Sequence, residues 1–174
     1  MASILPKSGT LGLRLATHLL RRTTFGFTKA QADLFAGLSV TQALDQLFTS
    51  PTLPPHPIDP TTGLTWVISG RTGANSPDED LNGVTNSWFL DFALADQTTP
   101  SLYQRLVFFL HTLFPTGHND IEFSENFYYT IRLFMVMAQG NCSIKELALK
   151  VCLDNGMNNY LDIGDSEAGN PNEN

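Results

Sequence analysis

The stretch that decides the fold class is SLYQRLVFFLHTLF, residues 101–114. On a helical wheel its polar side chains fall within about a third of the circumference, and the rest of the wheel is apolar. These polar residues are Gln104, Arg105, His111 and Thr112. A helix with so narrow a polar arc normally lies at the centre of its domain. We therefore expect a central helix here, opened by Thr99 and Pro100.

Amphipathic helices are expected on both sides of this segment. Leucines 11, 15 and 19 stack at i, i+4 spacing over residues 11–23. A Ser or Thr followed three residues later by Gln or Glu is a capping box, and three such pairs begin at Thr28, Ser39 and Ser143. Further helices are indicated at 85–96 and 124–139, with one more turn at 157–162. The predicted fold is all-α, an irregular domain of six or seven helices.

One long Pro/Gly-rich connection, residues 49–83, interrupts the helical pattern. Its first part, SPTLPPHPIDPTTG, holds five prolines, and a short extended piece is indicated at LTWVIS. Connections of this length are functional, form an interface or are mobile. An alternative is that this one wraps the domain with Trp66 as an anchor. The predicted organisation is one domain, divided into N-terminal helices at 1–48, the connection at 49–83, a helical core at 84–161 and an acidic tail at 162–174.

The charge and hydropathy of the 174-residue chain narrow the classes of partner. Its formal net charge is −7, which argues against non-specific nucleic-acid binding. No run reaches the roughly 18 apolar residues of a membrane span. The N-terminus lacks an early basic region, and Pro6 and Lys7 break its apolar run, so no signal peptide is visible. The cell compartment stays open.

Three stretches taken together resemble a bacterial family known as domain of unknown function 1800. They are HLLRRTTFGFTKAQ (18–31), RLVFFLHTLF (105–114) and LDNGMNNYLD followed by NPNEN (153–174). The resemblance implies a helical fold and a longer protein, and a genomic context of exported proteins, but no activity. The family often has His-x-His in its second stretch, whereas Leu113 stands two residues after His111 here.

The last residues, GNPNEN at 169–174, have the features of a helix start. Asn170 is a good N-cap, Pro171 suits the first helical position, and Glu173 stands three residues after the cap. In the resembling family this motif continues into a helix. We therefore expect the chain to be the N-terminal helical part of a larger protein; the rival interpretation is a naturally short protein with a frayed tail.

A polar site is predicted where the three family-like stretches would converge. Arginine forks match phosphate and carboxylate, so His18 and Arg21 are candidates for binding an anion. A partly buried Arg105 needs an acceptor, and an ion pair with Asp91, Asp154 or Glu173 is expected. The predicted polar site comprises His18, Arg21, Arg105, His111, Asn172 and Glu173. None of them is assigned a catalytic role.

Metal ligation is an open alternative at two places, and no cofactor is predicted. His111 and His118 lie near acidic residues in HTLFPTGHNDIE, and Asp162 and Asp165 lie in the acidic tail. Imidazole and carboxylate groups suit a divalent metal, but neither place has a standard ligand spacing. The other interpretation is a helix C-terminus with a solvated turn, and a solvated acidic linker.

Two functions are consistent with these observations. The first is a scaffold or binding module that packs against its missing C-terminal portion or a protein partner. The alternative is half of a hydrolytic or metal-assisted enzyme, whose site the missing C-terminal sequence completes.

Overall fold

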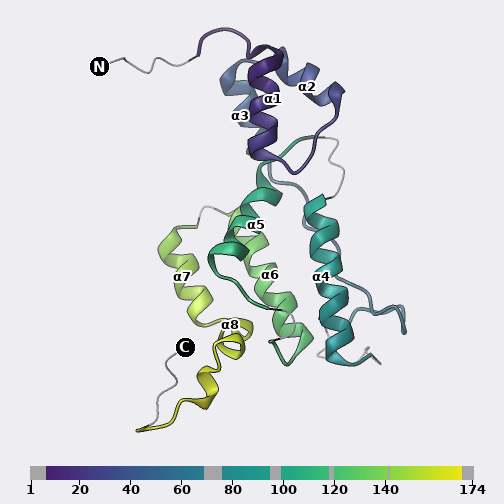
Figure 1. Ribbon diagram of the computed structural model, residues 1–174, viewed down its shortest axis with the longest axis vertical. Coiled ribbons are helices and arrows are strands. Elements are labelled where there is room, and N and C mark those ends of the chain that lie inside the picture. Colours follow the sequence, from purple (N-terminus) through teal and green to yellow (C-terminus); the bar gives the residue numbers. More distant parts are fainter. Residues whose placement is uncertain (1–6, 69–75, 95–98, 118–119, 141, 170–174) are drawn as a thin grey trace. The chain divides into compact units, whose positions relative to one another are not determined.

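The computed structural model describes residues 7–68, 76–94, 99–117, 120–140 and 142–169 (Figure 1). These residues form helices and no strand, which confirms the predicted all-α fold. The helices are α1 (Gly12–Thr23), α2 (Lys29–Ala36), α3 (Val40–Leu47), α4 (Asp78–Leu94), α5 (Tyr103–Leu113), α6 (Ser124–Gln139), α7 (Ile144–Cys152), α8 (Asn155–Tyr160) and the 3-10 helix η1 (Ile163–Asp165). Helix α8 lies near the further turn that the sequence indicates.

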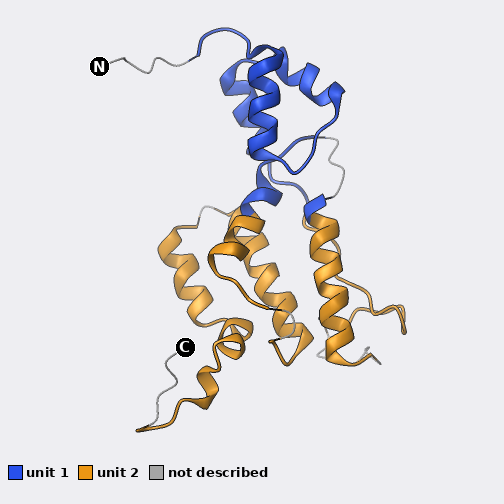
Figure 2. Cartoon of the chain, in the orientation of Figure 1, with its two compact units in different colours: residues 1–52, 93–106 blue, residues 53–92, 107–174 orange. Residues whose placement is uncertain are grey.

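The chain divides into two compact units, which we describe separately (Figure 2). Unit 1 comprises residues 1–52 and 93–106, and unit 2 comprises residues 53–92 and 107–174. One boundary follows Thr52 in the connection, and the other two fall within α4 and α5. Whether the chain is a single domain, as the sequence predicts, stays a prediction.

Unit 1 is built on three short helices with a shared apolar core. Thr28 with Gln31 and Ser39 with Gln42 form the predicted capping boxes at the starts of α2 and α3. The buried core residues come from all three helices and the residue before α1: Leu11, Ala16, Leu20, Ala32, Phe35, Ala43 and Leu47. The segment before α5 closes the unit, because the Leu102 amide donates to the Leu47 carbonyl at 2.9 Å.

Unit 2 has its core between α4, α6 and the proline-rich connection. Trp66 is fully buried, and its indole Nε1 donates to Ser124 Oγ at 3.0 Å. Ser124 Oγ in turn donates to Asp78 Oδ1 at 2.8 Å. This buried chain of hydrogen bonds joins the connection to the first turns of both helices. It confirms that Trp66 anchors a connection that wraps the helices.

Further hydrogen bonds hold the proline-rich segment against α4 and α6. The Trp88 indole donates to the Pro55 carbonyl at 2.7 Å. His56 Nδ1 lies 2.5 Å from the Tyr128 hydroxyl. Asp59 is fully buried, and its carboxylate accepts from the Thr61 amide at 2.8 Å. Prolines supply carbonyl acceptors but no amide donor, so donors from helix side chains complete this packing.

Two predicted helix starts and one predicted extended piece are wrong. Helix α4 begins at Asp78 and not at Thr85, because three acidic residues in its first turn complement the helix dipole. Helix α5 begins at Tyr103, whose amide donates to Ser101 Oγ at 3.2 Å, and not after Thr99 and Pro100. The extended piece at LTWVIS is absent among its described residues, 64–68, which contain bends and turns.

The central helix is less buried than its wheel predicts. Phe109 and Leu113 expose 55% and 47% of their surface, although they belong to the apolar part of α5. The two residues are four positions apart and therefore lie on the same face of the helix. Part of the apolar arc of α5 is thus accessible on the molecular surface.

The junction between α7 and α8 carries the LDNG part of the third family-like stretch. Asp154 is the N-cap of α8 and accepts from the Met157 amide at 2.9 Å. A Cβ at Gly156 would lie 2.1 Å from Thr130 Oγ1 and 2.8 Å from the Asn126 carbonyl oxygen. Gly156 therefore lets α8 approach α6 closely. Helix α7 ends at Cys152, and Asn155 and Gly156 already belong to α8.

Candidate functional site

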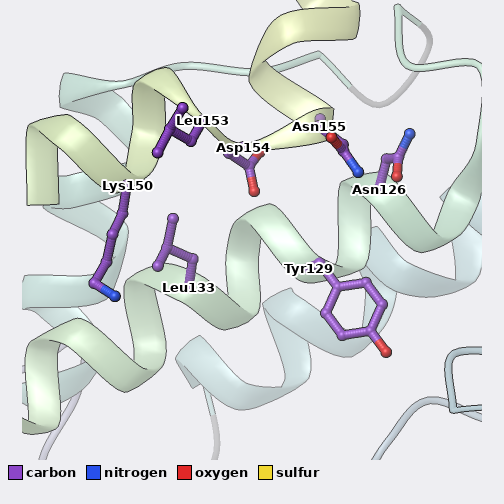
Figure 3. Close-up of a pocket in the computed structure, with 8 residues that line it drawn as sticks. Asn126, Tyr129, Leu133, Lys150, Leu153, Asp154 and Asn155 are labelled. Carbon is purple, nitrogen blue, oxygen red and sulfur yellow. The ribbon is translucent and has the colours of Figure 1, made fainter.

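Two adjoining hollows on unit 2 share Asn126 and Tyr129 of α6, and we call them together the α6 groove. The first has a volume of about 370 Å³ and is shown in Figure 3. Its lining residues are Asn126, Tyr129, Leu133, Lys150, Leu153, Asp154, Asn155 and Gly156. The second has a volume of about 300 Å³. It adds Val67, Ile68, Phe123 and Glu125 to the shared pair.

The floor of the groove follows from the spacing of residues on α6. Asn126, Tyr129 and Leu133 are three and four positions apart, so they form one stripe on the helix surface. Val136 continues this stripe and is 48% exposed. The opposite side of α6 is buried in the core through Phe127, Ile131, Phe134 and Met135. Helix α6 therefore has a buried face and an accessible face that is also partly apolar.

Tyr129 separates the two hollows and is held in place there. Its hydroxyl donates to the Val67 carbonyl, and its ring packs edge-on against Tyr128, with centroids 5.1 Å apart. The Tyr129 residue remains 50% exposed. A ring with one fixed polar end and one open face is suited to contact with a ligand's apolar group.

The far wall of the first hollow comes from α7 and α8 (Figure 3). Leu153 is 79% exposed at its rim. The Asp154 carboxylate is already engaged, because its Oδ2 accepts from Thr130 Oγ1 at 2.5 Å as well as from the Met157 amide. The polar groups open to a ligand are therefore the amides of Asn126 and Asn155 and the Lys150 ammonium. They suit hydrogen bonding to a ligand, and they include no nucleophile paired with a base.

Arg105 of the predicted polar site has backbone acceptors in place of the expected carboxylate. In unit 1 its Nε donates to the Thr24 carbonyl at 3.0 Å, and its guanidinium lies 4.8 Å from the centroid of the Phe25 ring. A second nitrogen, Nη2, donates to the Arg21 carbonyl at 3.4 Å. Arg105 thus satisfies carbonyls at the C-terminal end of α1, and it joins the first two family-like stretches structurally.

His111 lies in unit 2, between aromatic rings. Its ring centroid is 5.5 Å from that of Phe89 and 6.3 Å from that of Phe134. Burial lowers the pKa of His111 below its usual value, and a hydrogen bond with the Thr116 backbone partly opposes this. Its Nε2 is buried and has no hydrogen-bond partner within the described part of the chain. This environment favours the neutral imidazole.

The remaining predicted residues are placed as follows. His18 and Arg21 are exposed on α1 and line a separate hollow of unit 1. Asn172, Glu173 and His118 lie outside the described residues. Asp162 and Asp165 are exposed at η1. Among the residues that the structure describes, no group of three or more His, Cys, Asp or Glu side chains could hold a metal ion. The metal site and the enzyme alternative stay predictions.

The sequence does not predict the α6 groove, although part of the signal is present in it. The stripe Asn126, Tyr129, Leu133 is visible as helical spacing, but an apolar stripe indicates core as readily as surface. The other walls come from residues near 67 and 153, which are distant in sequence. Their approach depends on the wrapping connection and on the turn before α8.

Fold and surface together define a helical protein with an open, largely apolar groove. Among its described residues, no helix is long and apolar enough to cross a membrane. A family model described as "Protein of unknown function (DUF1800)" matches residues 18–174. The chain belongs to this family, as the three stretches indicate. No curated protein and no solved structure matches the chain.

Proposed function

We propose that the protein is a polypeptide-binding module and that the α6 groove is its docking surface. The observation that carries this proposal is the half-exposed Tyr129, fixed between two hollows that exposed apolar residues surround. Ile68, Phe123 and Leu153 expose 65%, 45% and 79% of their surface. Contiguous exposed apolar surface with a polar rim is typical of interaction sites, and tyrosine is enriched at their centres.

The composition of the groove favours a polypeptide over a small polar substrate. Its floor and walls offer apolar contacts to side chains, while Asn126 and Asn155 can donate to and accept from a peptide backbone. Two hollows on either side of one aromatic ring suit two apolar side chains of the same segment. Such a segment could belong to a partner protein or to further sequence of the same protein.

The experiment is the selection of binders from a displayed library of random peptides, using the folded 174-residue chain as bait. We expect enrichment of peptides with two or more apolar anchors. Leu153→Gln should weaken their binding by about five- to thirtyfold, since a desolvated apolar anchor contributes on the order of 1–2 kcal/mol. Tyr129→Ala should weaken it further.

The matched control is Leu34→Gln, which changes an exposed leucine (54%) of unit 1 outside the groove. It should leave peptide binding unchanged. Circular dichroism of each variant checks that the helices remain folded. Failure to enrich apolar peptides would refute the proposal, as would enriched peptides that bind Leu153→Gln and Tyr129→Ala as well as the unmodified chain.

A further inference from the structure

Unit 1 carries a cationic face on α1 that the proposed function does not use. Arg14, His18 and Arg21 are four and three positions apart, so they lie along one side of the helix, and all three are exposed. They line an open hollow of about 700 Å³. Its other lining residues are Leu13, Leu15 and Thr17.

The position of Arg14 is unfavourable for the isolated helix. Arg14 is the third residue of α1, near the positive end of the helix dipole, and the first turn contains no acidic residue. Within the described part of the chain, the side chains of Arg14, His18 and Arg21 make no hydrogen bond or ion pair.

The charge of unit 1 differs from that of the whole chain. The residues of unit 1 include six Lys or Arg and three Asp or Glu, whereas those of unit 2 include four and fourteen. Unit 1 is therefore net positive, although the chain carries −7 overall. A local positive potential concentrates anions at this face even on an acidic protein.

We propose that the cationic face of α1 binds a phosphate-bearing ligand. Guanidinium groups bind phosphate oxygens in a bidentate manner, and an anion near Arg14 would offset the unfavourable position of this cation in the first turn of α1. Arg14 and Arg21 are separated by about 10 Å along the helix axis, so the face can contact more than one anionic group. Leu13, 55% exposed at the same hollow, offers apolar contact to the rest of the ligand.

Two sources share this chemistry, a soluble oligophosphate and a phospholipid headgroup, and two probes distinguish them. The first probe is tripolyphosphate, titrated into the chain at low ionic strength and followed by isothermal titration calorimetry. The second is co-sedimentation with phosphatidylcholine vesicles, with and without phosphatidylglycerol. Binding of tripolyphosphate alone assigns a soluble ligand, and sedimentation that depends on phosphatidylglycerol assigns a lipid headgroup.

Charge-reversal variants test the site itself. Arg14→Glu and Arg21→Glu should each weaken binding of the active probe at least about tenfold, since a charge-assisted hydrogen bond is replaced by repulsion. Arg22→Glu is the matched control, because it makes the same change of charge on an exposed α1 residue that does not line the hollow. Arg22→Glu should weaken probe binding by less than about threefold, through the change in the overall charge of unit 1.

Binding of neither probe would overturn the proposal, and so would an equal loss in the Arg22→Glu variant. Leu153→Gln, the variant that tests the peptide groove, should leave phosphate binding unchanged. A failure of this inference is therefore distinguishable from a failure of the proposed function.

Discussion

Two helix starts in unit 1, those of α2 and α3, and two in unit 2, those of α4 and α6, depend on hydrogen bonds of different range. In unit 1 the helix starts depend on side chains three residues away, such as Thr28 with Gln31 and Ser39 with Gln42. At the starts of α4 and α6 in unit 2, the corresponding polar contacts join residues far apart in sequence. Trp66 reaches Ser124, and the Asn82 side chain donates to the Ile121 carbonyl at 3.0 Å.

The difference explains where functional surface can form. Local caps define a helix but place no other segment against it. Long-range hydrogen bonds bring an irregular segment onto the helices, and its residues Val67 and Ile68 then become one wall of the α6 groove. The peptide-binding surface that we propose therefore depends on the wrapped connection, whereas the cationic face needs α1 alone.

The largest effect should come from removing the anchor of the connection. Trp66→Ala leaves a cavity in the unit 2 core and leaves Ser124 Oγ without its donor. We expect a loss of about 3–5 kcal/mol in the free energy of unfolding, measured by urea denaturation. Trp66→Phe keeps most of the apolar volume and should cost clearly less. Equal stabilities of the Ala variant and the unmodified chain would contradict the role of Trp66 as an anchor.

A matched pair of glycines tests the close approach of α8 to α6. Gly156→Ala places a Cβ against Thr130 Oγ1 and the Asn126 carbonyl, so we expect destabilisation by about 1–3 kcal/mol. Gly83→Ala, inside α4, meets no atom within 4 Å and should stabilise by up to about 1 kcal/mol through helix propensity. Thermal melts of both variants give opposite signs if the packing is as described, and the same sign if it is not.

Much of the fold is predictable from the sequence because its signals are local. Helical periodicity and the Thr28 and Ser39 caps act within one or two turns, and the structure retains both caps. The start of α4 is missed because SPDED fits a turn as well as an acidic first helical turn. Both use the same residue types, and only the packing of Asp78 against Ser124 distinguishes them.

The candidate sites are less predictable from the sequence, because the contacts that form them join residues far apart in the chain. Arg105 is recognisable as a residue that needs an acceptor, but backbone carbonyls at the end of a distant helix leave no sign in the sequence. Leu153 carries no sequence signal for its place at the rim of the groove, where it is 79% exposed. The cationic face of α1 is the exception, since helical spacing alone places His18 and Arg21 together.

Arg105 makes long-range contacts within unit 1. Replacing this residue tests whether the local caps are enough to keep unit 1 stable. Arg105→Met keeps the aliphatic stem but removes the donors to the Thr24 and Arg21 carbonyls and the contact with Phe25. We expect a loss of about 1–2 kcal/mol in unfolding free energy, and a smaller loss for Arg105→Lys. Hydrogen exchange should show faster opening of the last turn of α1. Unaltered exchange there would mean that water replaces the guanidinium without cost.

The smallest effect should be a pH dependence that arises from His111. Because burial lowers its pKa in the folded chain below the unfolded value near 6.5, the unfolded chain binds the proton more readily. The contribution of His111 to the free energy of unfolding is complete above about pH 6.5 and is lost as the pH falls from there towards the lowered pKa.

His111→Gln removes this titration, so the urea midpoint of this variant should fall less than that of the unmodified chain between about pH 7.5 and about pH 5.5. Every other titrating group is common to the unmodified chain and the His111→Gln variant, so the difference between their decreases in urea midpoint isolates His111. Equal decreases would show that the imidazole is hydrated in the folded state.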